Sequence, residues 1–201
     1  MSLTESMIQD RSPFDIFNEW NNDAYNADIY EPAAMTVATV GEDGRPSARM
    51  VLLRGVDEHS FVFYTNYHSR KGKELEHCPW ASAVVYWDRL HRQVRIEGPV
   101  EKTKTQLSDD YFASRPRGSQ ISAVASVQSA VIVDRLVLEA EVTRLESEFG
   151  EKAVPRPDFW GGYRIKPERI EFWQGQEDRL HDRIVFEPYG ENLWKHYRLS
   201  P

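Results

Sequence analysis

The amino-acid sequence predicts an α+β fold in which an antiparallel sheet closes, or nearly closes, into a barrel with helices beside it. Three observations support this prediction. From residue 34 onward, several segments alternate apolar and polar residues with the period of two that is typical of strands. Short polar turns connect most of these segments, as in an antiparallel meander. The segments with helical periodicity come in blocks rather than after every strand.

The predicted elements follow one another along a single domain. A first helix begins at Ser12-Pro13, because serine is a good helix cap and proline suits the first helical position. The predicted strands are 34–40, 46–55, 61–66, 81–87, 93–102, 161–166, 168–173, 179–186 and 193–199. The other predicted helices are 69–79, 105–114, 117–126 and 129–149. Residues 1–11 are expected to form a short mobile segment, and residues 12–201 a single domain.

Composition limits the classes of partner. The chain has 25 basic and 32 acidic residues, a net charge of −7, which argues against nucleic acid because phosphate backbones are bound by basic faces. The single cysteine, Cys78, excludes an intramolecular disulfide and fits a reducing compartment. No apolar run approaches a membrane span, and residues 1–10 lack the layout of a signal peptide. We expect a soluble, cytoplasmic protein that binds no membrane.

A first candidate site lies at Ser69-Arg70-Lys71, at the start of a predicted helix. Cations are unfavourable at this end of the helix dipole, whereas the free backbone N–H groups there bind anions. Arginine and lysine in the first turn therefore make sense if a phosphate binds. A solvated basic helix end, partly neutralised by Glu74 and Glu76, explains the same residues equally well.

Tyr111, Arg115 and Ser119 form a second candidate site. Tyr111 and Arg115 are four residues apart, so they share one helical face. Arg115 and Ser119 flank the break at Pro116, where a new helix N-terminus offers further N–H donors. Hydroxyl and guanidinium groups suit phosphate oxygens. Ordinary capping with an exposed arginine is the alternative.

A third candidate site lies near the C-terminus. If residues 179–183 are extended, Arg179, His181 and Arg183 point to one face, where they repel one another unless an anionic ligand or carboxylates face them. A salt-bridge network is the alternative. Arg49 and Arg54 have opposite parity on their strand, so each by itself indicates only a surface residue.

Other chemistries find little support. No G-x-G-x-x-G follows a strand, and no G-x-x-x-x-G-K-[ST] occurs. The histidines lack metal-ligand spacing, so no metal site is expected. No G-x-S-x-G nucleophile motif is present. The cationic, hydroxyl-bearing clusters in this acidic, aromatic-rich chain would suit two different phosphorylated aromatic ligands.

Seven segments, in order, resemble the successive blocks of the pyridoxine (pyridoxamine) 5′-phosphate oxidase family. They are ARMVLLRG, FVFYTNYHSRKGKELE, RQVRIEGPVE, YFASRPRGSQISA, SVQS, PDFWGGYRI and IEFWQGQEDRLHDR. The resemblance covers the chain from about residue 13 to its end and implies a split β-barrel that binds FMN at the interface of a homodimer. It further implies oxidation of pyridoxine 5′-phosphate or pyridoxamine 5′-phosphate to pyridoxal 5′-phosphate, with O2 reduced to H2O2.

The resemblance also implies a residue set. The FMN contacts would be Arg49, Met50, Val51, Leu52, Leu53, Arg54, Tyr64, Thr65, Arg70, Lys71, Gln93, Gln128, Ser129, Trp173 and Arg183. The substrate contacts would be Arg54, Tyr111, Arg115, Ser119, Arg179, Leu180 and His181. Within these sets, Arg49, Arg70 and Lys71 would hold the flavin phosphate. Arg179 and His181 would be the catalytic residues, which orient and polarise the substrate.

Two positions depart from the family pattern. Arg54 stands where many relatives have lysine, so a planar fork replaces a compact ammonium. Relatives often have a basic and aromatic N-terminal arm that folds over the substrate. In this sequence, residues 1–11 contain one basic residue, Arg11, and no tyrosine. Two alternatives stay open: a non-catalytic flavin- or pyridoxal-phosphate-binding protein, and a related reductase with another substrate.

Overall fold

The computed structural model describes residues 3–4, 8–57, 59–190 and 193–201. Its helices are α1 (Pro13–Asn26), α2 (Arg70–His77), α3 (Thr105–Ser114), α4 (Arg117–Ala125) and α5 (Arg135–Phe149), with short 3-10 turns η2 (Asp88–Leu90) and η3 (Glu177–Arg179). Its strands are β1 (Ala34–Val40), β2 (Pro46–Val56), β3 (Phe61–Asn66), β4 (Trp80–Trp87), β5 (Arg92–Lys102), β6 (Trp160–Ile165), β7 (Arg169–Gln174), β8 (Asp182–Pro188) and β9 (Trp194–Arg198).

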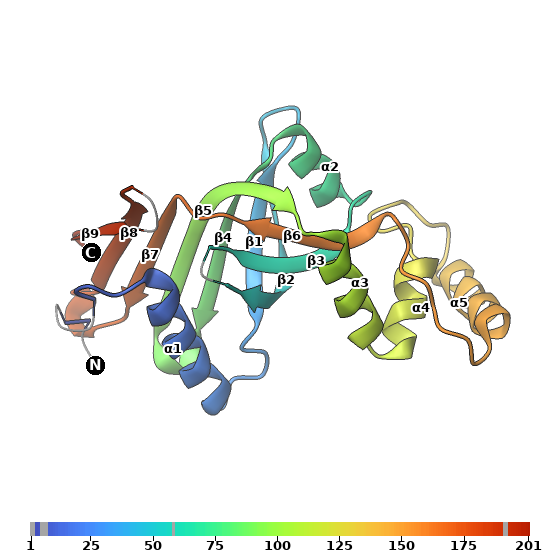
Figure 1. The fold of residues 1–201 in the computed structure, drawn as a ribbon, viewed down its shortest axis with the longest axis horizontal. Helices are drawn as coiled ribbons and strands as arrows, with labels where there is room; N and C mark the ends of the chain where they lie inside the picture. Colours follow the sequence, from blue (N-terminus) through green and yellow to red (C-terminus); the bar gives the residue numbers. More distant parts are fainter. Residues whose placement is uncertain (1–2, 5–7, 58, 191–192) are drawn as a thin grey trace.

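Six of the strands close into a barrel. The hydrogen-bonded order is β4-β1-β2-β3-β6-β5, and β5 pairs back with β4 to complete the ring. The strands β7, β8 and β9 extend the sheet outward from β5, and all these pairings are antiparallel (Figure 1). The predicted α+β class with an antiparallel barrel and flanking helices is confirmed.

Strand β5 belongs to both the barrel and its extension because it bends. Its first half pairs with β4 and β7, whereas Val100 to Lys102 pair with β6. The bend brings Gly98 against the carbonyl of Lys166, where an added Cβ would lie 2.1 Å from that oxygen. Only glycine permits so close an approach of two backbones.

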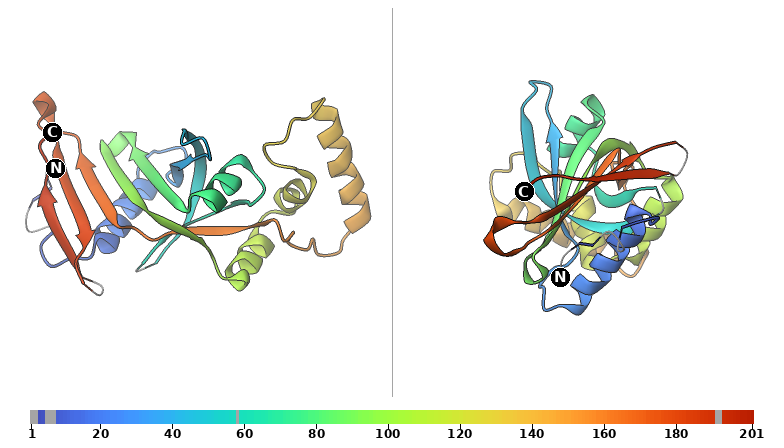
Figure 2. Two further views of the ribbon diagram at one scale, coloured as in Figure 1. Left: turned by 90° about the horizontal axis from the view of Figure 1, so that it is seen from above. Right: turned by 90° about the vertical axis from the view of Figure 1, so that its left-hand side faces the viewer.

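The main core fills the barrel, and α1 covers one side of it. The Ser12 side chain accepts a hydrogen bond from the Phe14 N–H, as expected for the predicted cap. The aromatic residues Phe17 and Trp20 of α1 are almost fully buried against the sheet. A smaller apolar cluster around Phe112 and Trp160 packs beneath α3, α4 and α5. These three helices lie at one end of the molecule, and β7–β9 lie at the other (Figures 1 and 2).

Two predicted boundaries are wrong. The helix expected at 129–149 begins at Arg135, because the Asp134 side chain caps it by accepting from the Leu136 N–H. The strand expected at 179–186 begins at Asp182. The segment before it forms a 3-10 turn in which Asp178 and Arg179 have positive φ angles of 51° and 62°. The chain reverses there so that β8 can pair with β7, and the predicted single strand face for residues 179–183 therefore does not exist.

The N-terminal residues that are described pack on the fold. Leu3 and Ile8 are buried, with exposed fractions of 3% and 1%. The Leu3 N–H donates to Asp182, and Arg198 donates to the Leu3 carbonyl. The expectation of a mobile segment also falls on residues 1–2 and 5–7, which lie outside the described residues. Within the described ranges, no helix has the length and apolar character needed to cross a bilayer.

Candidate functional site

A polar network lies where the N-terminus of α2 meets β1 and β2. The buried carboxylate of Glu74 accepts hydrogen bonds from the hydroxyls of Thr39 at 2.5 Å and Ser47 at 2.7 Å. The guanidinium groups of Arg49 and Arg70 donate to it at 3.0 and 2.8 Å. Burial by itself would raise the pKa of Glu74, but these four donors outweigh it and lower the pKa to about 2. Glu74 is therefore ionised at neutral pH.

Lys71 joins this network to a distant loop. Its Nζ donates to the Thr65 hydroxyl at 3.0 Å and to the Gln128 side-chain oxygen at 3.1 Å. Burial, followed by the nearby charge of Arg49, lowers the pKa of Lys71 to about 8, whereas Glu74 acts in the opposite direction. Lys71 is thus still mainly charged at neutral pH. Five of the residues predicted to contact FMN, namely Arg49, Thr65, Arg70, Lys71 and Gln128, come together here.

The charge of this network suits a phosphate. Arg49, Arg70 and Lys71 carry three positive charges and Glu74 one negative charge, which leaves a net charge of +2. The N-terminus of α2 adds its own positive potential, although the Ser69 side chain already accepts from the Gly72 N–H. A dianionic phosphoryl group therefore fits the donor set of this chain.

A second cluster surrounds Arg115. The rings of Tyr64 and Tyr111 stack at 4.0 Å between centroids, and Trp160 stacks on Tyr64 at 5.6 Å. The Arg115 guanidinium lies over the Trp160 ring at 4.7 Å. Burial lowers the pKa of Arg115. Its Nη1 is buried without a hydrogen-bond partner, and no other side-chain nitrogen or oxygen among the described residues is in that state.

Arg115, which carries this unpartnered nitrogen, lines a cavity of about 430 Å³. Ser119 also lines it, so two of the three residues predicted for this site meet there, whereas Tyr111 is not among the lining residues. The others are Asn66, Gly118, Ser122, Ala123, Ser126, Gln128, Leu138, Val142 and Trp160. Gln128 also hydrogen-bonds Lys71, so the cavity and the Lys71 network share a wall. Because a buried donor without a partner is costly, this cavity favours an anionic or hydrogen-bond-accepting ligand.

A third cluster lies on the outer face of the extended sheet. Gln93, Trp173 and Arg183 are directly opposite one another on β5, β7 and β8, so their side chains share a face. Arg183 donates to the buried carboxylate of Glu171 at 2.7 Å, and this hydrogen bond raises the pKa of the Arg183 guanidinium. Arg95 contacts the same carboxylate. For Arg183, the salt-bridge interpretation of the sequence therefore applies.

His181 is oriented by its own loop. Its Nδ1 accepts a hydrogen bond from the Gln176 backbone N–H at 3.1 Å, so the neutral ring carries its proton on Nε2. The ring lies 4.7 Å from that of Trp173. Arg179 and Leu180 are exposed, Leu180 by 71%. The loop between β7 and β8 therefore carries two groups that can bind an anion or an acceptor, the Nε2–H of His181 and the exposed guanidinium of Arg179.

One chain does not bring all the predicted residues together. The loop between β7 and β8, with Arg179 and His181, belongs to the end of the molecule opposite α3 and α4, which frame the Arg115 cavity (Figure 1). Arg54 lines a separate pocket of about 260 Å³ beside α1. Among the other predicted contacts, Met50 and Leu52 are exposed on β2, Ser129 is exposed in the loop after α4, and Val51 and Leu53 face the core. The last two could therefore reach a ligand only through backbone atoms.

Two family models together match most of the chain. Residues 22–148 match the family model described as pyridoxamine 5′-phosphate oxidase, and residues 160–201 match the pyridoxine 5′-phosphate oxidase C-terminal dimerisation region. The chain belongs to the pyridoxamine 5′-phosphate oxidase family. This is a family of oxidoreductases, and the predicted resemblance is confirmed.

Curated relatives match the chain over nearly its whole length. A pyridoxine/pyridoxamine 5′-phosphate oxidase of Burkholderia thailandensis is 54% identical over 192 residues, covering 94% of this chain and 89% of the relative. One of Rubrobacter xylanophilus is 52% identical, covering 96% and 88%. Among solved structures, PhzG from Burkholderia lata in complex with tetrahydrophenazine-1-carboxylic acid superposes with a TM-score of 0.92 at 34% identity, covering 99% and 98%.

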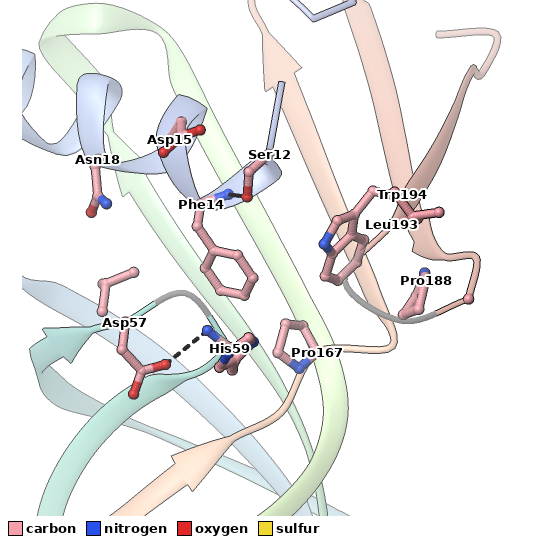
Figure 3. Close-up of a pocket in the computed structure, with 12 residues that line it drawn as sticks. Ser12, Phe14, Asp15, Asn18, Asp57, His59, Pro167, Pro188, Leu193 and Trp194 are labelled. Carbon is pink, nitrogen blue, oxygen red and sulfur yellow. Dashed lines mark hydrogen bonds between the residues drawn. The ribbon is translucent and has the colours of Figure 1, made fainter. Parts of the chain in front are cut away.

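Another cavity, of about 620 Å³, contains none of the residues predicted from the family. It lies between α1, the turn from β2 to β3 and the hairpin from β8 to β9 (Figure 3). Phe14 and Trp194 line it, and so do Asp15 and Asp57, whose carboxylates disfavour a phosphate. Asp57 already accepts from the His59 backbone N–H.

Sequence reasoning named Glu74 only as a carboxylate that partly neutralises the helix start, and it did not foresee that Glu74 also binds Arg49, Thr39 and Ser47. Nor did it place Trp160 beneath Arg115 in the second cluster. The ion pair of Arg70 and Glu74, four residues apart on one helix, agrees with the neutralisation that the sequence suggested as the alternative. No pattern in the sequence links Glu74 to Arg49 or Trp160 to Tyr64. The packing of α2 on the paired strands β1 and β2 brings the first two together, and the pairing of β3 with β6 brings the other two together.

Proposed function

We propose that this member of the pyridoxamine 5′-phosphate oxidase family is an FMN-dependent oxidase of phosphorylated vitamin B6. One observation carries the proposal. Arg115, whose Nη1 is buried without a hydrogen-bond partner, lines a cavity that shares Gln128 with the cationic Lys71 network. Two neighbouring anion sites suit two phosphorylated ligands, whereas a simple flavin carrier requires only one.

The first cluster would hold FMN. Arg49, Arg70 and Lys71 would bind its phosphate, with Thr65 and Gln128 oriented beside Lys71. Bound FMN would supply the acceptor for the hydride and would return two electrons to O2. The protein would contribute the position and electrostatic environment of the two rings.

The second cluster would hold the substrate phosphate through Arg115, Ser119 and the hydroxyl of Tyr111, whose ring is fixed by stacking on Tyr64. Each proposed reaction removes two electrons from the substrate and transfers them to O2. Pyridoxine 5′-phosphate and O2 give pyridoxal 5′-phosphate and H2O2. Pyridoxamine 5′-phosphate, water and O2 give pyridoxal 5′-phosphate, ammonia and H2O2.

We further propose a homodimer in which the β7–β8 loop of one chain completes the site of its partner. The match of residues 160–201 to a dimerisation region supports this, as do the exposed apolar side chains of Met50 and Leu52 on the barrel surface. In that arrangement Arg179 and the Nε2–H of His181 would orient and polarise the substrate. Gln93, Trp173 and Arg183 would border the flavin.

A second candidate function is the oxidation of another flat heterocycle that bears an acid group. The superposition on PhzG, bound to tetrahydrophenazine-1-carboxylic acid, favours it, because Arg115 could pair with a carboxylate as well as with a phosphate. The names of the relatives at 50–54% identity support the vitamin B6 reaction instead. Location in the cytoplasm is proposed from the single cysteine, Cys78.

Anaerobic reduction of the flavin tests the proposal. Protein loaded with FMN should be yellow and should bleach when pyridoxine 5′-phosphate or pyridoxamine 5′-phosphate is added without oxygen, and readmitted O2 should restore the colour. Protein that stays yellow with both vitamers would contradict the oxidase function and favour a carrier or the second candidate. Protein that takes up no FMN would contradict all of these.

A further inference from the structure

The carboxylate of Glu74 organises the guanidinium of Arg49. Both terminal nitrogens of Arg49 are occupied: Nη1 donates to the Val37 carbonyl and the Thr39 hydroxyl, and Nη2 donates to the Ser47 hydroxyl and to Glu74. The hydroxyls of Thr39 and Ser47 in turn donate hydrogen bonds to Glu74. Glu74 thus sets the direction of the side-chain hydrogen bonds around Arg49.

The same carboxylate separates like charges. Arg49 approaches from β2, and Arg70 and Lys71 come from the first turn of α2. Arg49 and Arg70 each form an ion pair with Glu74, and within the described ranges neither pairs with a second carboxylate. The side chains of Glu74 and Arg49 are 7% and 21% exposed, so water screens their ion pair weakly. Arg70 is 67% exposed, and its ion pair with Glu74 is screened more strongly.

We propose that Glu74 is a positioning residue for the cofactor phosphate: it fixes Arg49 and Arg70 and offsets their mutual repulsion, so that the cluster faces a dianionic phosphoryl group as a preformed site. This inference rests on the proposed binding of FMN. It adds Glu74 to the residues of the FMN site, where the family resemblance gave it no role. It also explains why a site for an anion contains a buried anion of its own.

Glutamine cannot replace this carboxylate. One oxygen of Glu74 accepts from Arg70, and the other accepts from Arg49. An amide has a single oxygen, so whichever position its nitrogen takes, one guanidinium loses its acceptor and faces another donor. Removal of the negative charge would by itself favour a phosphate. Because that gain requires the guanidiniums to keep their positions, we expect the loss of positioning to dominate.

The test compares FMN with riboflavin, which lacks the phosphate. Dissociation constants for both flavins would be measured by quenching of flavin fluorescence in wild type, Glu74→Gln and Glu76→Gln. Glu76 is an exposed carboxylate on the same helix, so its variant controls for the change in net charge. We expect Glu74→Gln to lose about tenfold or more of the preference for FMN, with riboflavin affinity unchanged, because charged hydrogen bonds are lost. Glu76→Gln should keep the wild-type preference.

The outcomes separate this inference from the proposed function. A wild type without preference for FMN over riboflavin would overturn the phosphate site itself. A wild-type preference that Glu74→Gln preserves or increases would overturn only the role of Glu74. If Glu74→Gln does not fold, Ser47→Ala takes its place, since it keeps the charge but removes one hydroxyl link between Glu74 and Arg49. It should reduce the FMN preference by about threefold, and an unchanged preference would overturn the inference.

Discussion

Arg115 should destabilise the protein when its ligand is absent. In Arg115→Met the aliphatic stem is kept and the buried, unpartnered Nη1 is removed. Leaving such a donor unsatisfied costs about 1–3 kcal/mol, whereas the lost contact with the Trp160 ring at 4.7 Å is worth only about 0.5–1 kcal/mol. The variant should therefore be more stable by about 1 kcal/mol, which corresponds to roughly 2–4 °C in melting temperature for a chain of this size.

The same substitution should abolish recognition of the phosphate. Added to FMN-loaded protein, the product pyridoxal 5′-phosphate should raise the melting temperature of wild type but not of Arg115→Met. The KM for pyridoxine 5′-phosphate should rise about 10–100-fold, as expected when charged hydrogen bonds worth about 1.5–3 kcal/mol are lost. Thermal unfolding by circular dichroism and steady-state kinetics measure the two effects.

Arg117 provides a matched control two residues away. Its guanidinium donates to the carbonyls of Gly150 at 2.6 Å and Lys152 at 2.8 Å. Arg117→Met should therefore lower the stability by about 1 kcal/mol and leave the KM unchanged. If Arg115→Met destabilises the flavin-free protein as Arg117→Met does, the reasoning from the unpartnered nitrogen is refuted.

Four further predictions follow from the same contacts. The pKa of Glu74 is lowered from 4.5 to about 2 in the folded protein. Above pH 4.5, ionised Glu74 should therefore contribute up to roughly 3 kcal/mol to the free energy of unfolding. The difference in unfolding free energy between wild type and Glu74→Gln should then disappear as the pH falls from 4.5 to 2; a constant difference in urea titrations would contradict this. FMN affinity, measured by fluorescence, should fall as the pH rises above about 8. Lys71 loses its proton in that range, and the FMN phosphate binds the charged form of Lys71 more tightly than the neutral form. An affinity that does not change with pH would exclude Lys71 as a phosphate ligand. Gly98→Ala should destabilise by about 3 kcal/mol or more in thermal unfolding, whereas Gly118→Ala, whose Cβ meets nothing within 4 Å, should be neutral or stabilising. Arg179→Met should lower turnover markedly and leave FMN bound, and equal loss of flavin in equilibrium binding would argue against its role toward the substrate.

Local sequence patterns were sufficient to predict helices and strands whose structure depends mainly on residues within the same segment. Ser12 caps the first helix, and the alternation after residue 34 gives the strands that form the barrel. The same kind of reasoning failed at residues 179–181, because the positive φ angles of Asp178 and Arg179 arise from the pairing of β8 with β7. It also placed the start of α5 six residues too early, because it did not recognise Asp134 as the residue that caps this helix.

The candidate site divides in the same way. Short segments of the chain were enough to identify the family. The same segments predicted Arg115, Ser119 and Lys71 as site residues, and the structure brings the first two to one cavity. They could not show that Glu74 contacts Arg49, or that Gln128 joins the cavity to the Lys71 network, because these partners are separated by 25 and 57 residues. Nor could they show that Arg179 and His181 lie at the end of the molecule away from the cavity.

The sequence by itself determined the fold class, the family and the identity of the charged side chains, because periodicity, caps and motif blocks are properties of short stretches of chain. Only the tertiary structure decided which charges are paired, which nitrogen is left without a partner, and that one chain holds the two halves of the proposed site apart. The physical reason is that burial and ion pairing depend on closure of the barrel, which brings β1, β2 and α2 together while β7–β9 extend away from α3 and α4.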